Sequence, residues 1–455
     1  MRIVVVGAGK VGVTLTQILS DEGHDVTIID NENQILNETQ ESLDVAVVEG
    51  NGALVEVQRA AGVNQSDLLI AATSSDEINL LCCLIAKKLG CRSTVARVRN
   101  LEYDQQFDFL KEDMGLSFSI NPEKTAAREI YQVLQYPSFL KRDSFANGLV
   151  ELVELKIKED SPFVGKSLFQ AGNLREINAL VCAAERDGKV YIPSGSYTFA
   201  VDDKITVAIE TANLSKLVNA FNISHKKVRH VMIAGGSRIA QYLAEMLLYH
   251  GIKVTIIDED KERCEEISAI LPEALIINGN AADEKLLDSE GISETDAMVT
   301  LTGIDEENVV ISILASHFGV AKVITKLNRL EYTNLFAKMG LDTIVRPKLL
   351  TANEIVRFVR AVSVDGNNNM ESFYRISDGK VESIGFTVPD EANFLRVPLA
   401  QLKIRPNTLL ANIIRGGKVI IPNGGSWMQP GDSVVIVTLS EDEKVSSLND
   451  IFTLK

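Results

Sequence analysis

The sequence predicts an α/β protein with two tandem doubly wound parallel-sheet domains, each followed by a small α+β lobe. Short β-branched runs alternate with helical patterns over residues 1–120. Near residue 148 the pattern changes to short, turn-rich strands, and near residue 228 the whole order of segments starts again. These three observations indicate a duplicated unit of two lobes.

The first thirty residues carry a strand, a glycine turn, a helix and a second strand. The apolar run Ile3–Val6 suits a buried parallel strand and leads directly into the turn Gly7–Gly12, GAGKVG. A helical pattern follows, and the run Val26–Ile29 ends on Asp30. This order, with an acid about 20 residues after the glycines, is the dinucleotide-binding fingerprint of Rossmann-like domains.

The residue types in the fingerprint fit a nucleotide. Gly7 allows the sharp turn, Gly9 lets the backbone approach a pyrophosphate, and Gly12 lets the helix pack closely on the strand. Asp30 can accept hydrogen bonds from two free ribose hydroxyls, which favours NAD over NADP and does not separate NAD from ATP. The alternative is a glycine turn that binds nothing, which the complete unit disfavours.

Two further loops follow predicted strands. The strand at 44–48 leads into a loop with Gly50 and Asn51, which we expect near the adenine or ribose, although a plain turn explains it equally well. The strand at 68–72 leads into Thr73 and Ser74, whose hydroxyl and amide groups can reach a ligand. Ser75 or Asp76 is expected to cap the helix at 78–89.

The strand predicted at 94–99 places Arg97 and Arg99 on one face. Guanidinium groups at the carboxyl edge of such a sheet can pair with phosphates, and surface solvation is the alternative. Residues 115–120 are expected to supply a sixth strand. The predicted boundaries are residues 1–120 for the first sheet domain, 121–147 for a connecting helix, and 148–224 for the first small lobe.

The second unit repeats the first with changes at its turn. Val254–Asp258 repeats Val26–Asp30 letter for letter, and KVIIPNG at 418–424 mirrors KVYIPSG at 189–195. Ser237 and Ala240 stand where the first unit has glycines, and Lys326 stands where it has Arg97. We therefore expect weaker nucleotide binding in this unit, through Gly235, Ser237, Arg238, Asp258 and Thr302. Its predicted parts are a sheet domain at 228–345, a connecting helix at 346–366 and a small lobe at 367–453.

Composition excludes several classes of protein. The net charge of −16 disfavours nucleic acid as a partner. Five cysteines without a CxxC pair indicate reduced thiols and a cytosolic setting, and Cys82-Cys83 lies in an apolar helix that suits the core. Met1 leads directly into the first strand, so we expect no signal peptide, and no apolar run approaches the ~18 residues of a membrane span.

The chain resembles the TrkA family, cytosolic subunits of bacterial Trk-type potassium uptake systems with two tandem RCK units. The resemblance rests on GAGKVG at 7–12, Asp30, EGNGA at 49–53, ATSSDE at 72–77, ARVR at 96–99 and the duplicated order of lobes. It implies NAD(H), and ATP or ADP in the same kind of cleft, as ligands. It also implies a homo-oligomer built through the Rossmann-like lobes, attached peripherally to the inner face of the plasma membrane through a membrane-embedded potassium translocator.

The predicted function is therefore a gating subunit without catalytic residues or a metal. The predicted ligand-binding residues of the first unit are Gly7, Ala8, Gly9, Lys10, Val11, Gly12, Asp30, Gly50, Asn51, Thr73, Ser74 and Arg97. A dehydrogenase is one alternative, but the five histidines (His24, His225, His230, His250 and His317) lie in no motif with a catalytic partner. A nucleotide sensor with a non-channel partner is the other.

Overall fold

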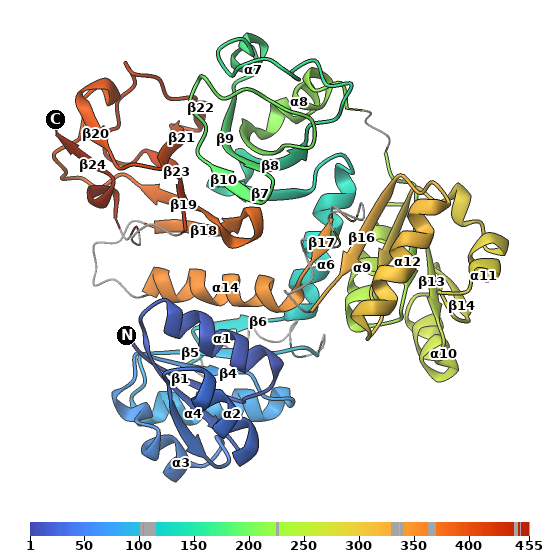
Figure 1. Ribbon diagram of the computed structural model, residues 1–455. Coiled ribbons are helices and arrows are strands. Elements are labelled where there is room, and N and C mark those ends of the chain that lie inside the picture. The colour runs from blue at the N-terminus through green and yellow to red at the C-terminus, as the bar shows by residue number, and fades with distance from the viewer. Residues whose placement is uncertain are drawn as a thin grey trace.

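The computed structural model describes residues 1–100, 103, 115–223, 227–328, 336, 341, 343–362, 370–440, 445 and 447–454. His225 and residues 363–366 of the second predicted connecting helix lie outside this set. Four lobes are visible in Figure 1, two with parallel sheets and two with antiparallel sheets, as the sequence predicts.

The first parallel sheet has the strand order β3-β2-β1-β4-β5-β6, which is the doubly wound order of dinucleotide-binding domains. Its order reverses between β1 and β4, which places a ligand crevice at their carboxyl ends. The strands are β1 (Arg2–Val6), β2 (Asp25–Asp30), β3 (Ala46–Glu49), β4 (Leu68–Ala71), β5 (Ser93–Arg97) and β6 (Phe118–Ile120). The helices are α1 (Lys10–Asp21), α2 (Asn33–Ser42), α3 (Val55–Ala60) and α4 (Asp76–Leu89).

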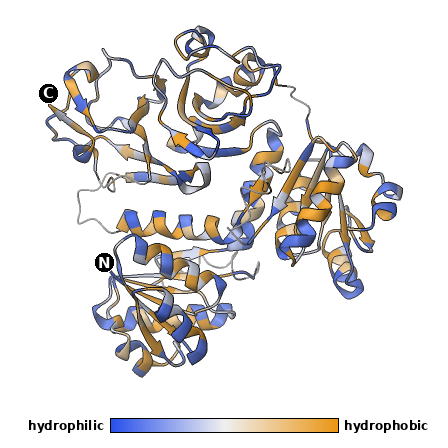
Figure 2. Ribbon diagram, in the orientation of Figure 1, coloured by the Kyte–Doolittle hydropathy of each residue, from blue (hydrophilic) through white to orange (hydrophobic). Residues whose placement is uncertain are grey.

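The second parallel sheet repeats this order as β14-β13-β12-β15-β16-β17. Its strands are β12 (His230–Ala234), β13 (Lys253–Asp258), β14 (Leu275–Asn278), β15 (Ala297–Thr300), β16 (Lys322–Lys326) and β17 (Ile344–Val345). The helices around it are α9 (Arg238–Tyr249), α10 (Lys261–Ile270), α11 (Glu284–Ser289) and α12 (Asp305–His317). The strands of both parallel sheets are largely apolar (Figure 2), because both faces are covered by helices.

Each small lobe is built on a five-stranded sheet whose neighbouring strands are antiparallel. The first contains β7 (Lys141–Phe145), β8 (Val150–Lys156), β9 (Ala179–Arg186), β10 (Lys189–Tyr191) and β11 (Lys204–Glu210), with α7 (Gly172–Glu176) and α8 (Leu214–Ala220). The second contains β18 (Met370–Ile376), β19 (Val381–Thr387), β21 (Thr408–Arg415), β22 (Lys418–Ile420) and β23 (Ser433–Leu439), beside the pair β20 (Leu402–Ile404) and β24 (Phe452–Leu454). The two lobes share one apolar core, to which Leu152 and Val437 belong.

The two connecting helices are exchanged between the units. Helix α6 (Pro122–Gln135) buries Ile130 and Val133 in the core of the second parallel sheet, beside Ile233. Helix α14 (Pro347–Val362) instead belongs to the core of the first parallel sheet, where it packs beside α1 (Figure 1). Each unit therefore depends on a helix from the other for part of its core.

The connecting segment predicted at 121–147 is not one helix. Helix α6 ends at Gln135, and residues 141–145 form strand β7 of the small lobe. The sequence KRDSF hides this strand because its polar side chains are covered through ion pairs, such as Arg142 Nε to Glu151 Oε2 at 2.9 Å. In the part of the chain that the structure describes, no helix has both the length and the apolar character to cross a membrane.

Candidate nucleotide-binding cleft

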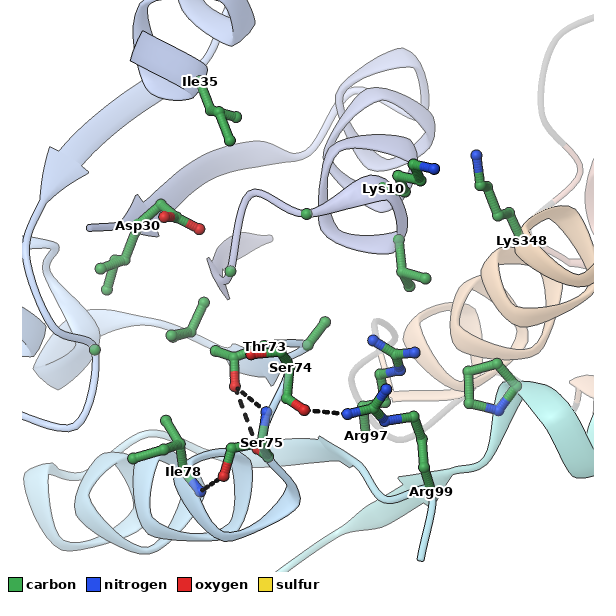
Figure 3. Close-up of a pocket in the computed structure, with 18 of the residues that line it drawn as sticks. Lys10, Asp30, Ile35, Thr73, Ser74, Ser75, Ile78, Arg97, Arg99 and Lys348 are labelled. Atoms are coloured by element: carbon green, nitrogen blue, oxygen red, sulfur yellow. Dashed lines mark hydrogen bonds between the residues drawn. The ribbon is translucent and has the colours of Figure 1, made fainter. Parts of the chain in front are cut away.

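A cavity of about 720 Å³ lies at the carboxyl ends of the first parallel sheet (Figure 3). The structure brings together there most of the residues that the sequence predicts for the first unit. Those lining it are Gly7, Gly9, Lys10, Val11, Asp30, Gly50, Asn51, Thr73, Ser74 and Arg97, with Ser75 and Arg99 beside them. Ala8 and Gly12 were also predicted to bind the ligand, but they lie behind the turn and do not line the cavity.

The glycine turn leaves the start of α1 open. Gly7 has φ +103°, and a Cβ on Gly12 would lie 1.8 Å from the Gly7 carbonyl oxygen, so neither position accepts a side chain without a shift. A Cβ on Gly9 would meet nothing within 4 Å, and Gly9 caps α1 without a side-chain hydrogen bond. The first N–H groups of α1 and the positive end of its dipole are thus available to an anion.

Asp30 is oriented by the backbone around it. Its Oδ2 accepts a hydrogen bond of 2.5 Å from the Ala8 amide, and its Oδ1 accepts one of 3.0 Å from the Glu32 amide. Ala8 therefore contributes by positioning Asp30. A carboxylate has about four acceptor sites, so both oxygens retain capacity for ribose hydroxyls.

Asn79 fixes the loop after β4, and the prediction from sequence missed it. This fully buried side chain accepts hydrogen bonds from the Thr73 amide (2.8 Å) and hydroxyl (2.7 Å), and it donates one of 2.9 Å to the Arg97 carbonyl. Asn79 thus joins the ends of β4 and β5 under the cleft. Its signal in the sequence is the spacing from Thr73, which the second unit repeats as Thr302 and Asn308.

Two guanidinium groups enter the cleft from the end of β5. Arg97 Nη2 lies 3.6 Å from Glu123 Oε1, and its buried Nε finds no hydrogen-bond partner among the residues that the structure describes. Burial lowers the Arg97 pKa, and the Glu123 carboxylate opposes this shift. The Arg99 guanidinium donates to the Ser74 carbonyl, which it reaches across the cleft (Figure 3).

The cap of α4 is Ser75, whose hydroxyl accepts a hydrogen bond of 3.2 Å from the Ile78 amide. Asp76 does not cap the helix but binds the backbone that follows β5. Its carboxylate accepts the backbone amides of Arg99 and Asn100, each at 2.8 Å, and so holds the segment after β5 against α4. Of the two capping residues considered from sequence, the structure selects Ser75.

The second unit supplies part of the wall of this cleft, which the sequence did not predict. The residues are Ile239, Lys326, Asn328, Pro347 and Lys348. The Lys326 ammonium group donates to the Thr302 carbonyl at 2.5 Å, whereas Lys348 points into the cavity (Figure 3). The signal available in the sequence is that Pro347-Lys348 stands where the first unit has Pro122-Glu123.

The second unit has a smaller cleft of its own, about 360 Å³. Gly235, Ser237, Asp258 and Thr302 line it as predicted, but the Ser237 hydroxyl caps α9 by accepting from the Ala240 amide at 3.4 Å. Arg263 also occupies this site and donates to the Gly236 carbonyl at 2.7 Å. The protein's own side chains therefore take positions that are open in the first cleft.

Arg238, which was predicted to bind nucleotide in the second unit, does not line the second cleft. It lines a groove between the two sheet domains, together with Arg99 and Tyr242. The Tyr242 hydroxyl in this groove donates to the Arg99 carbonyl at 3.0 Å and accepts from Asn121 Nδ2 at 2.9 Å. The second domain is thereby tied to both the end of the cleft and the start of α6.

The cysteines lie away from the cleft. All five are free and buried, and burial raises the pKa of the Cys82 thiol to about 12. Such a thiol is a core residue and a poor nucleophile at neutral pH. Within the described ranges, no three His, Cys, Asp or Glu side chains are grouped to hold a metal ion.

Comparison with known proteins agrees with this architecture. Residues 3–121 and 231–347 match the TrkA-N domain model, and residues 152–222 and 384–449 match the TrkA-C domain model. The Trk system potassium uptake protein TrkA homolog 1 of Methanosarcina mazei is 31% identical, over 97% of this chain and 98% of the relative.

Solved structures share the fold at low sequence identity. The GsuK RCK domain aligns with a TM-score of 0.65 and 17% identity, over 97% of this chain and 92% of that one. The GsuK channel bound to NAD aligns with a TM-score of 0.64 and 17% identity, over 97% and 77%. The chain therefore belongs to the TrkA family, with a TrkA-N domain and a TrkA-C domain in each of its two units.

Proposed function

We propose that this chain is a cytosolic regulatory subunit of a potassium uptake system and that it binds an adenine nucleotide in the first cleft. The observation that carries the proposal is the cleft itself. The glycine turn leaves the start of α1 open for a phosphate, and Asp30, held by the Ala8 amide, lines the same cavity and can accept from a ribose. The full-length relatives are named as Trk potassium uptake proteins, which supplies the physiological setting.

The proposed ligands are NAD(H), ATP and ADP. Each has an adenosine ribose with two free hydroxyls for Asp30 and a phosphate chain for the glycine turn, Thr73, Ser74 and Arg97. The GsuK structure with NAD supports this class of ligand in the same fold. We expect the second cleft to bind weakly, because the Ser237 hydroxyl already accepts an amide at the start of α9 and the cleft is about half the volume of the first.

The proposed mechanism is a shift between lobe arrangements. A nucleotide changes this equilibrium only by its different affinity for the two arrangements. Helices α6 and α14 join the sheet domains to the small lobes and lie at the edge of the cleft through Pro122 and Pro347. They are therefore placed to carry a change in the cleft to the small lobes, and from there to a membrane-embedded potassium translocator.

We further propose that the cleft binds nucleotide without converting it. Its described lining includes no histidine, cysteine or tyrosine, and the Glu123 carboxylate is paired with Arg97. A dehydrogenase needs a group that exchanges a proton with the substrate beside the nicotinamide. The proposal is therefore of a sensor, and a turnover assay tests it.

The decisive experiment compares Asp30→Ala with Asp258→Ala by calorimetric titration with NADH, NAD, ATP and ADP. The two aspartates make matching hydrogen bonds, since the Asp258 carboxylate accepts the Gly236 amide at 2.5 Å and the Asp260 amide at 2.8 Å. Asp30→Ala should weaken binding more than about tenfold, because a hydrogen bond to a charged group contributes ~1.5–3 kcal/mol. Asp258→Ala should leave the affinity of the first cleft nearly unchanged.

Three results would contradict parts of this proposal. If the wild type bound no nucleotide, the glycine turn would have only a structural role. Sustained oxidation of NADH with a small substrate would establish a dehydrogenase. Failure to copurify with a membrane potassium translocator, despite tight nucleotide binding, would favour a sensor with a non-channel partner.

A further inference from the structure

Helices α1 and α14 form a pair that joins the two units. They pack through one apolar core, in which Leu15 and Leu19 of α1 lie with Ile355 and Val359 of α14. Both helices begin at the nucleotide cleft, because Lys10 and Lys348 in their first turns line it. They therefore run in the same direction away from the cleft.

The ends of this pair away from the cleft are fixed by a buried ion network. Glu22, directly after α1, contacts Arg360 of α14 at 2.7 and 3.0 Å and Arg375 of β18 at 2.6 Å. Arg360 also contacts Glu382 of β19 at 3.2 Å. The side chains of Glu22 and Arg360 are 4% and 9% exposed, so separating them would leave buried charges unpaired.

At the ends of α1 and α14 that face the cleft, the nearby charges repel each other instead. Lys10 and Lys348 both line the cavity, and their ammonium groups end beside each other next to the start of α1 (Figure 3). Among the described residues, neither ammonium group has a hydrogen bond or ion pair. Each also lies at the start of a helix, where the dipole is positive and a cation is unfavourable. Two like charges and two helix ends therefore oppose close approach.

The electrostatics around Lys348 agree with this geometry. Burial lowers its pKa, and the charge of Lys10 lowers it further. Asp305 acts in the opposite direction, but its carboxylate already accepts the backbone and side-chain amides of Asn328 at 2.8 and 2.9 Å. In the part of the chain that the structure describes, no carboxylate forms an ion pair with either lysine, so the two make a cationic site in the cleft wall.

We propose that Lys10 and Lys348 form a phosphate clamp, in which a phosphate of the bound adenine nucleotide sits between the two ammonium groups and draws the cleft ends of α1 and α14 together. The Glu22–Arg360 contact acts as the fixed end of this movement. The clamp rests on the proposed function and adds to it a binding residue from the second unit. Its ligand class is a nucleotide with a phosphate chain, and adenosine alone would not close it.

The clamp couples the second small lobe directly to the nucleotide cleft. Helix α14 leads into that lobe, and Arg360 at its far end is bonded to Glu382 there. A change in the angle between α1 and α14 must therefore move the lobe or break buried ion pairs. The second unit, whose own cleft is partly filled, would then serve the first cleft as its movable wall.

The test is titration of ATP into the wild type, Lys348→Gln and Lys88→Gln. Lys88 is an exposed lysine in the last turn of α4, at the end of that helix away from the cleft, so its substitution removes the same charge without touching the site. Lys348→Gln should lower ATP affinity by about tenfold and weaken its salt dependence, as loss of a charge-assisted contact does. Lys88→Gln should bind ATP as the wild type does.

Hydrogen exchange supplies the structural readout. ATP should slow exchange in the first turns of α1 and α14 in the wild type, and not in Lys348→Gln. Lys348→Glu places a carboxylate opposite Lys10 and should slow exchange there without nucleotide. Adenosine should change neither segment.

The outcomes separate the clamp from the proposed function. If Lys348→Gln binds and protects like the wild type while Asp30→Ala has lost binding, the clamp is wrong and the nucleotide site stands. If the wild type binds no nucleotide, both are wrong. If Lys348→Glu fails to protect α14 in the absence of nucleotide, repulsion from Lys10 is not what holds the helix ends apart.

Discussion

Asn79 and Asn308 hold equivalent loops in the two units, which makes them a matched pair for separating stability from binding. Asn308 accepts the Thr302 amide at 2.9 Å and donates to the Lys326 carbonyl at 3.2 Å, as Asn79 does with Thr73 and Arg97. Both side chains are fully buried. Their structural roles are thus alike, whereas only Asn79 lies under the open cleft.

We predict that Asn79→Ala and Asn308→Ala each lower the free energy of unfolding by about 1–3 kcal/mol, because each leaves buried amide and carbonyl groups without partners. Only Asn79→Ala should also weaken nucleotide binding, since it frees the Thr73 loop. Chemical denaturation and calorimetric titration measure the two effects. An equal loss of affinity in both variants would show that the second unit contributes to binding, through its own cleft or through the Lys326 wall of the first.

The sequence predicted the site residues that belong to a motif and missed the site residues that do not. The glycine turn and Asp30 have a fixed spacing, because their contacts with backbone and phosphate require it. Lys348 reaches the cleft only because α14 crosses to the other unit, so no local spacing identifies it. The position of Arg238 was hidden for the same reason, because it lines a groove shared with the first domain.

Among the elements, the strands of the parallel sheets were predictable because buried parallel strands are continuous apolar runs. Strand β7 was not, because its polar side chains are covered by contacts that form only in the fold: Arg142 pairs with Glu151 on the neighbouring strand, and Lys141 donates to the carbonyl of distant Arg375. The exchange of α6 and α14 was also hidden. Ala127 and Ile130 of α6 repeat as Ala352 and Ile355 of α14, so the sequence of either helix suits the core of either sheet.

Helices α4 and α12 carry apolar side chains on the outside of the two sheet domains. Leu81 is 41% exposed on α4, and its counterpart Val310 is 49% exposed on α12, with Ile313 one turn further at 36%. Apolar residues at equivalent exposed positions of two helices suit contacts between copies of the chain. We propose that the homo-oligomer implied by the family resemblance makes contact through these helices.

Val310→Asp should dissociate this oligomer, because a carboxylate in a buried contact loses its hydration. Glu307→Gln, a neutralising change on the same helix, is the control. The molar mass from light scattering measures the effect, with nucleotide affinity as a check on folding. An unchanged mass in both Val310→Asp and Leu81→Asp would place the contact elsewhere.

For the whole molecule, the exchanged helices make two repeated units into one interdependent structure. The first sheet domain needs α14 for its core, the second needs α6, and the small lobes share a third core. Packed helices therefore connect the first cleft to the other lobes. Repetition in the sequence predicts two units, but only the three-dimensional arrangement shows that neither is complete alone.

Glu129 on α6 lies at the meeting point of these parts and predicts a dependence of stability on pH. It lines a polar cavity with Lys141 of β7 and Asn353 of α14. Burial raises the Glu129 pKa to about 7; repulsion from Asp143 adds to the shift, and Lys141 opposes it. The protonated, neutral carboxyl group is therefore the form that suits the folded state.

The sign of the effect follows from the two states. In the unfolded chain the pKa of a glutamate is about 4.3, so the folded form binds the proton more tightly. Glu129 therefore stabilises the fold most at low pH. This contribution is lost as the pH rises from about 4.5 through 7. We predict that Glu129→Gln, which stays neutral, loses less stability than the wild type over this range. Exposed Glu41→Gln is the control, and parallel curves of unfolding free energy against pH for all three proteins would show that Glu129 carries its charge in the folded state without cost.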